Sequence, residues 1–360
     1  MTGTWVAGPT NSIVDVDGLR VGHHTRTGNG WLTGTTVVVG PPEGMVGGVD
    51  VRGGGPGTRE TDVLGLTTAQ TPVHAVVLGG GSAFGLAAAS GVADSLEEDG
   101  VGVEVTTPYG TMTVPIVPAA IVFDLGRGGD PKCRPDPGFG AAAYRAASTE
   151  PPAQGCVGAG TGSVAGAIKG GIGSASVVID GAVTVAVITA VNAAGSAVDP
   201  ANGELYGVRF GLPGEYDRLR APATPELDRA RAGGQVHPPS AHAPAGPAPL
   251  NTTIGVVATD AVLTRPQCTK LAAVVHDGMA RALRPCHSMQ DGDSVFALAT
   301  GRGPSPDDGL FFSILAAGAD CFARAVVNAM LAATSVTTPV GSWPSYLDLM
   351  PSAMEAKGQQ

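Results

Sequence analysis

The sequence feature that most constrains the fold is an abrupt change of composition at Asn251. Residues 220–250 hold seven prolines, many alanines and almost no large apolar side chains, which is typical of an exposed, poorly ordered tether. Residues 252–258 then alternate well enough to predict a strand. A tether normally joins independent domains, but residues 252–360 alone would form a small domain with few strands. A strand that begins directly after a tether makes sense if the chain is cut there.

The chain is long and apolar enough to bury a substantial core. It has 360 residues, of which 43% are hydrophobic and 14% charged, so wholesale disorder is not expected. The formal net charge is −10 and no basic run occurs. Nucleic-acid binding needs clustered Lys and Arg, so no such partner is predicted.

Cysteine usage and the amino terminus indicate a cytoplasmic location. The five cysteines are odd in number and widely spaced, which predicts neither a disulfide framework nor a metal site: Cys133, Cys156, Cys268, Cys286 and Cys321. Residues 1–12 lack a basic region followed by an apolar run, so no signal peptide is expected. The longest apolar stretches are broken by Gly, Thr, Asn or Asp, and no membrane span is predicted.

Strand and helix patterns alternate along the whole chain. The predicted strands cover 13–21, 35–39, 75–78, 101–106, 119–125, 252–258 and 293–299, and a hairpin covers 175–191 with its turn at Asp180-Gly181. The predicted helices cover 83–96, 141–147, 266 to about 283, and 310–333 with at least one interruption. Because both parts mix the two element types, we expect a layered α/β or an α+β fold.

Three glycine-rich segments predict loops and close packing. Residues 52–59, Arg-Gly-Gly-Gly-Pro-Gly-Thr-Arg, have little freedom to be anything but a loop. Residues 79–85 and 158–162 look superficially like nucleotide-binding loops. A phosphate loop needs Gly-Lys before a Ser or Thr, but Lys169 lies between Ile168 and Gly170. Phe84 and Ser163 stand where the dinucleotide pattern needs its third glycine. Tight backbone packing is therefore the better interpretation.

The dipeptide Asn251-Thr252 is the leading candidate for chemistry. A Thr hydroxyl can attack the preceding carbonyl, take over the acyl group and be released by water. The freed α-amine has a pKa near 8 and can then act as general base beside its own hydroxyl. Two plainer interpretations exist. Asn251-Thr252-Thr253 is a glycosylation sequon, and threonines commonly begin strands.

Asp291 and Asp293 flank a glycine and would point the same way in an extended chain. Each could then hold the hydroxyl and amine of an amino-terminal Thr, and their mutual repulsion could keep one protonated. Alternatives are a polar turn before a strand, or a metal site with His287. The metal site ranks last because further ligands are missing.

Lys169 and Asn192 are lone polar residues in glycine-rich or apolar surroundings. The default interpretation of Lys169 is a solvated side chain at a loop tip. The functional alternative is a positive charge and an amide donor that converge on a developing oxyanion.

Together these motifs resemble the L-aminopeptidase/D-amidase–esterase family of self-processing hydrolases, which also contains β-peptidyl aminopeptidases and the nylon-oligomer endo-hydrolase. The resemblance runs from about Asn11 to Gly301 and rests on residues 13–23, 52–62, 78–85 and 158–162, Lys169, Asn192, 251–255 and 291–293.

The resemblance implies one αββα sandwich like that of the N-terminal-nucleophile hydrolases, spanning residues 1–360 and cut into 1–251 and 252–360. It implies Thr252 as nucleophile, Asn192 on the oxyanion side and Lys169 in the pocket. It also implies Asp291 and Asp293 as the aspartate pair of the nylon-hydrolase branch, where the aminopeptidase branch has Ser and Glu. Phe123 aligns with a pocket tyrosine. A homo-oligomer, as a tetramer of processed heterodimers, is implied too.

The expected function is therefore hydrolysis of peptides or small oligoamides, with no cofactor, metal, nucleic acid or membrane. Acyl transfer of the ornithine acetyltransferase type is an alternative, although its Ala-Thr-Met-Leu cleavage context is missing. A binding protein without turnover is a second alternative.

Overall fold

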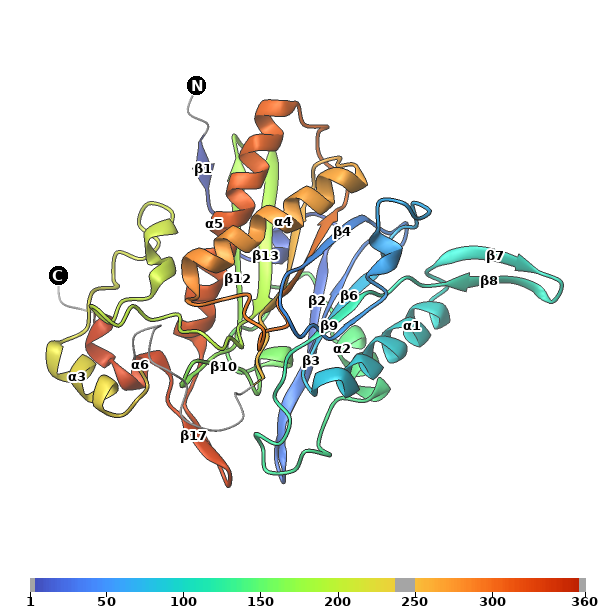
Figure 1. The fold of residues 1–360 in the computed structure, drawn as a ribbon. Coiled ribbons are helices and arrows are strands. Elements are labelled where there is room, and N and C mark those ends of the chain that lie inside the picture. The colour runs from blue at the N-terminus through green and yellow to red at the C-terminus, as the bar shows by residue number, and fades with distance from the viewer. Residues whose placement is uncertain (1–3, 237–249, 356–360) are drawn as a thin grey trace.

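Two β-sheets stack face to face, and helices cover the outer face of each (Figure 1). The computed structural model describes residues 4–236 and 250–355. Apolar side chains from both sheets form a shared core between them. A second core lies between the larger sheet and its helices, and a third lies between the smaller sheet and its helices. This order of layers is the expected αββα sandwich.

The larger sheet joins segments from both sides of Asn251. Its order is β1 (Trp5–Val6), β12 (Ile172–Ile179), β13 (Val183–Ala190), β14 (Ile254–Thr259), β15 (Ser294–Ala299) and β4 (Val46–Val51). Strands β14 and β15 are parallel, and every other neighbouring pair is antiparallel. Since β14 and β15 lie between β13 and β4, residues that follow Asn251 occupy the middle of a sheet begun by residues that precede it.

The smaller sheet has the order β2 (Arg20–Gly28), β3 (Trp31–Val39), β6 (Ala75–Gly79), β9 (Ala119–Ile121) and β5 (Thr58–Arg59). Its outer face packs against α1 (Ala88–Glu98) and α2 (Pro137–Arg145). A two-stranded ribbon, β7 (Val103–Thr107) and β8 (Gly110–Val114), extends away from this side of the molecule (Figure 1).

Double-sided burial explains the near-continuous apolar runs in the sequence. On β13, Val185 and Val187 belong to the core under the helices, whereas Ala186 and Ile188 belong to the core between the sheets. A strand buried on both faces needs apolar residues at every position, so it shows no alternation. The predicted hairpin at 175–191 is confirmed, with Ile179 paired to Val183 across the turn.

Helices α4 (Arg265–Ala282) and α5 (Asp308–Ala332) cover the larger sheet and cross closely. A β-carbon at Gly278 would lie 2.0 Å from the Ala319 carbonyl oxygen, so only glycine permits this crossing. The predicted interruption of the second helix is wrong, because α5 runs unbroken for 25 residues. By length and hydropathy α5 could also cross a membrane, but in this fold most of it is buried as a core helix.

Local side-chain hydrogen bonds account for two corrections to the predicted elements. The predicted strand at 13–21 begins as a 3-10 turn (Ile13–Asp15), because the Asp15 carboxylate accepts from the Thr10 and Ser12 backbone amides, and β2 starts only at Arg20. Helix α2 begins before 141 because Asp136 caps it. Within the predicted tether, residues 224–232 form α3 (Thr224–Ala232), whereas residues 237–249 lie outside the described residues.

Short elements complete the fold: β10 (Val164–Ala165), β11 (Ile168–Lys169), β16 (Val336–Thr338), β17 (Gly341–Trp343) and α6 (Tyr346–Leu349).

Candidate active site

The peptide bond between Asn251 and Thr252 is held at the start of β14, inside the protein. Both residues are buried. The Asn251 amide donates to the Gln290 carbonyl at 3.0 Å, and the Thr252 amide donates to the Asn192 carbonyl at 2.6 Å. The bond is thus fixed between the segment after β13 and the turn before β15. The predicted strand 252–258 starts two residues late because Asn251–Thr253 bind these two loops.

The Thr252 hydroxyl lies against the carbonyl group that precedes it. Its Oγ1 donates a hydrogen bond to the Asn251 carbonyl oxygen. The Gly292 amide points at the same place, 3.1 Å from Thr252 Oγ1 and 3.2 Å from the Asn251 oxygen. A β-carbon at Gly292 would come within 2.8 Å of Thr252 Oγ1. Glycine is therefore required here, and its N–H is placed to stabilise charge on the carbonyl oxygen.

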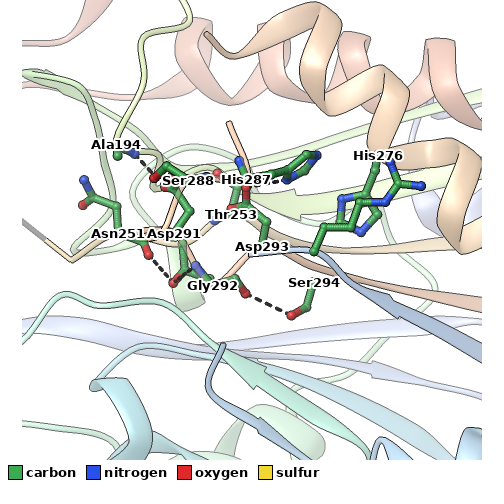
Figure 2. A network of polar contacts seen from close by, with 12 residues as sticks. Ala194, Asn251, Thr253, His276, His287, Ser288, Asp291, Gly292, Asp293 and Ser294 are labelled. Carbon is green, nitrogen blue, oxygen red and sulfur yellow. Dashed lines mark hydrogen bonds and ion pairs between the residues drawn. The ribbon is translucent and has the colours of Figure 1, made fainter. Parts of the chain in front are cut away.

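Asp293 joins the strand after Thr252 to His287 (Figure 2). One carboxylate oxygen accepts from the Thr253 amide at 2.7 Å. The other accepts from the His287 amide at 2.9 Å and from His287 Nδ1 at 2.8 Å. Burial has the largest single effect and lowers the pKa of His287, but the hydrogen bond to Asp293 and the interactions with Cys286 together outweigh it and raise the pKa to about 10. A charged His287 therefore accompanies this carboxylate at neutral pH.

Asp291 is directed to a different segment (Figure 2). Its Oδ1 accepts from the Ala194 amide at 3.0 Å, and its Oδ2 accepts from the Ser288 hydroxyl at 2.5 Å. Burial, reinforced by the charge of Asp293, raises the pKa of Asp291. The two carboxylates do influence each other, as predicted. In the uncut chain, however, neither carboxylate binds Thr252 directly. Asp293 fixes the backbone just after Thr252, and Asp291 fixes Ala194, two residues after Asn192.

The glycine-rich loop at residues 52–59 supports this turn from outside. The amides of Arg52 and Gly53 donate to the Asp293 carbonyl at 3.0 and 3.1 Å, and the Gly55 amide donates to the Asp291 carbonyl at 2.9 Å. A β-carbon at Gly53 would lie 2.2 Å from the Asp293 nitrogen. Backbone thus packs on backbone, which explains why the sequence allows no side chains here.

Arg127 connects Asn192 to Asn251, and sequence reasoning missed it. Its Nη1 donates to Asn192 Oδ1 at 2.5 Å, and its Nη2 donates to Asn251 Oδ1 at 2.9 Å. The side-chain nitrogen of Asn192, Nδ2, donates to the Phe123 carbonyl at 3.3 Å. Phe123 therefore contacts the site through its backbone. Asn192 itself contacts Thr252 through its main-chain oxygen. No motif surrounds Arg127, so only its single charge in a glycine-rich loop could have marked it.

Lys169 is fully buried, which contradicts the expectation of a solvated loop tip. Its Nζ donates to three backbone carbonyls, those of Gly160, Ser163 and Gly170, at 2.8–3.1 Å. Burial lowers its pKa to about 8. These bonds close the 158–163 turn, whose glycines leave no space for a β-carbon. Tight packing of this segment is confirmed, and no hydrogen bond joins Lys169 to Thr252 within the described residues.

The sequence that forms this site is similar to those of known proteins. Residues 11–343 match the family model described as Peptidase family S58. The chain belongs to this family. It is 46% identical over 360 residues to an uncharacterised aminopeptidase of Mycobacterium tuberculosis, covering 95% of this chain and 99% of that one. It is 30% identical over 276 residues to the 6-aminohexanoate-oligomer endohydrolase of Paenarthrobacter ureafaciens, covering 74% of this chain and 69% of that one.

Solved structures show the same fold. The β-aminopeptidase of Burkholderia sp. has a TM-score of 0.70 at 23% identity, with 97% of this chain and 94% of that chain covered. The L-aminopeptidase D-Ala-esterase/amidase of Ochrobactrum anthropi, described as a variant of the Ntn hydrolase fold, has a TM-score of 0.69 at 21% identity, covering 96% and 93%. Membership of Peptidase family S58 thus makes this chain a peptidase-type hydrolase, and the solved structures show that it has an Ntn-type fold.

The sequence-predicted residues of this S58 chain divide into two groups. Thr252, Asn251, Asn192, Asp291 and Asp293 surround one peptide bond. Lys169 lies outside that group and is linked to it indirectly. It binds the Ser163 carbonyl, and the amide of the next residue, Val164, donates to Asn192 Oδ1 at 2.9 Å.

Proposed function

We propose that this protein is a self-processing amide hydrolase whose nucleophile is Thr252. The observation that supports it best is the position of Thr252 Oγ1 against the Asn251 carbonyl, with the Gly292 amide directed at both oxygens. In the uncut chain this is an attacking hydroxyl beside an oxyanion donor.

The processing reaction has two balanced steps. Thr252 Oγ1 bonds to the Asn251 carbonyl carbon, the carbon–nitrogen bond breaks, and the nitrogen receives the proton that the hydroxyl loses. Water then hydrolyses the resulting ester. The products are a carboxylate on Asn251 and a Thr252 with a free α-amine and a free hydroxyl.

In the mature enzyme, the α-amine of Thr252 acts as general base for its own hydroxyl, since its ordinary pKa of about 8 lies close to neutrality. The substrate amide replaces residues 251–252 as the group attacked. Gly292 remains the donor to the oxyanion. Asp291 and Asp293 keep the new chain end in place, and their charge favours an ammonium group at that end. The substrates are peptides or small oligoamides.

Intact-mass analysis of the purified protein tests the proposal. Wild type should give two fragments, 1–251 and 252–360, without added protease, and Thr252→Ala should stay whole. Thr252→Ser keeps a hydroxyl and should still cut. Thr253→Val is a matched control, because the Thr253 hydroxyl has no hydrogen-bond partner among the described residues. A wild type that stays whole, or a Thr252→Ala chain that cuts at the same bond, would refute the proposal.

A further inference from the structure

The uncut chain shows what occupies the acyl side of the nucleophile. During processing, residue 251 becomes the acyl group esterified to Thr252 Oγ1. During turnover, the acyl part of a substrate becomes esterified to the same oxygen. Both esters are hydrolysed at the same place, so the contacts of Asn251 describe the subsite that a substrate's acyl residue enters.

Two contacts define that subsite. The Asn251 amide donates to the Gln290 carbonyl at 3.0 Å, which is where the free amine of an aminopeptidase substrate would lie. The Asn251 side-chain oxygen accepts from Arg127 Nη2 at 2.9 Å. The subsite thus offers an acceptor to the amine and a cationic donor to an oxygen on the γ-carbon.

Arg127 is rigidly held for this task. Its Nη1 donates to the Gly162 carbonyl at 2.7 Å as well as to Asn192 Oδ1. Its own carbonyl accepts from Thr338 Oγ1 at 2.8 Å. Gly162 and Asn192 therefore hold the guanidinium, with Nη2 directed at residue 251, and Thr338 holds the backbone of Arg127.

The charge of Arg127 has no ion-pair partner within residues 4–236 and 250–355. The nearby Asp124 carboxylate instead accepts from the Gly81 amide at 2.6 Å. Burial lowers the pKa of Arg127 to about 10, and Asp124 only partly opposes this. A desolvated cation without an ion-pair partner gains from a substrate oxygen, and most from a carboxylate.

We propose that Arg127 makes the mature enzyme select an amino-terminal residue with an oxygen on its γ-carbon, asparagine or aspartate, over the isosteric leucine. The inference rests on the proposed function, because it takes Thr252 as the common acyl carrier. Arg127 is in this view a specificity-determining residue that contacts the substrate side chain and not the reacting atoms.

Processed wild type should be assayed with the p-nitroanilides of asparagine, aspartate and leucine, which share one leaving group and nearly one shape. We expect kcat/KM for asparagine and aspartate to exceed that for leucine by roughly 10- to 100-fold, the effect of one hydrogen bond to a charged group. In processed Arg127→Met this ratio should fall to about one. Arg145→Gln removes an exposed arginine and should leave the ratio unchanged.

The wild-type series decides the matter even if Arg127→Met does not process. Equal kcat/KM for the three substrates, or a preference that survives in processed Arg127→Met, would overturn the role of Arg127. Either result would leave the proposed function standing, because turnover would still depend on Thr252. Failure of the proposed function would look different: an uncut chain, or amide hydrolysis equally fast in Thr252→Ala.

Discussion

The turn at residues 288–293 and the turn at residues 158–163 both surround buried charge, yet they use it differently. In the first, Asp291 accepts a hydrogen bond from the Ala194 amide and Asp293 accepts one from the Thr253 amide. In the second, Lys169 donates to three carbonyls, two of them in the turn it closes and the third its own neighbour's. Both turns also contain glycines that no other residue could replace.

The comparison shows that burial alone does not identify a catalytic group. Lys169 has all three of its donors satisfied by the backbone, so it has none left for a substrate. Gly292 has no charge, yet its amide reaches both the hydroxyl and the carbonyl of the reacting bond. The two turns thus differ in what their donors bind: the reacting peptide bond for Gly292, and backbone carbonyls away from it for Lys169.

The largest effect should come from the carboxylates of the 288–293 turn. Asp291→Asn and Asp293→Asn keep an acceptor but lose the charge that favours an ammonium at the mature chain end. We expect processing, turnover or both to slow by roughly 10²–10⁴-fold, as for a positioned acid–base partner. Single-turnover rates on variants that have already cut themselves measure this without interference from slow processing.

A solvated or purely structural pair would behave otherwise. In that case both variants would turn over at the wild-type rate once processed, and only stability would change, by about 0.5 kcal/mol or less. Such a result would also erase the contrast between the two turns.

Lys169→Met should instead lower stability and spare the chemistry. It leaves three carbonyls without their donor, which we expect to cost about 1–3 kcal/mol, whereas the rate of a processed variant should change by less than about tenfold. Urea unfolding in a Thr252→Ala background, where every chain is uncut, gives the free energy of unfolding. A rate loss as large as that of the aspartate variants, with unchanged stability, would place Lys169 in the chemistry.

The sequence predicted the central strands and singled out the Asn251-Thr252 bond because both leave local signals. The apolar runs of β13 and β14 require two buried faces, and the change at Asn251 marks the start of a strand. The strand predicted at 13–21 failed because valines and isoleucines alternate with aspartates there, a pattern that a strand and a capped turn share. The Asp15 carboxylate accepts a hydrogen bond from the Ser12 amide, and this contact favours the turn.

Arg127 and Gly292 could not be identified from the sequence for a different reason. Their roles depend on contacts across 124 and 40 residues of sequence. Nothing near Arg127 indicates that it will meet Asn251. Gly292 looked like a spacer between two aspartates, and only the approach of Gly55 and Thr252 shows why a side chain is excluded there.

His287 gives the aspartate turn a pH dependence of opposite sign to that of the lysine turn, where burial lowers the pKa of Lys169. Its pKa is raised from 6.5 to about 10 in the folded protein, because Asp293 and Cys286 together outweigh the opposing effect of burial. Its contribution to stability is therefore complete below pH 6.5 and is lost as pH rises towards 10. His287→Gln should destabilise the Thr252→Ala precursor by roughly 1–2 kcal/mol at pH 6 and by much less at pH 10. A pH-independent difference in unfolding free energy would contradict the ion pair.

The smallest expected effect is that of metal removal, which should not change the activity. His287 Nδ1 is engaged by Asp293, and His276 Nε2 lies 3.0 Å from the Asp50 carbonyl. The centroids of these two rings are 4.8 Å apart. The other nitrogen of each ring has no hydrogen-bond partner in the described part of the chain. Two imidazoles are too few for a zinc site, which needs three protein ligands or more, and no group of three possible ligands occurs among the described residues. Processed enzyme treated with EDTA should therefore keep its full rate on a small amide. Loss of activity that zinc or calcium restores would instead make His276 and His287 metal ligands. The carboxylates of the aspartate turn would then balance the charge of the metal ion rather than that of the Thr252 ammonium.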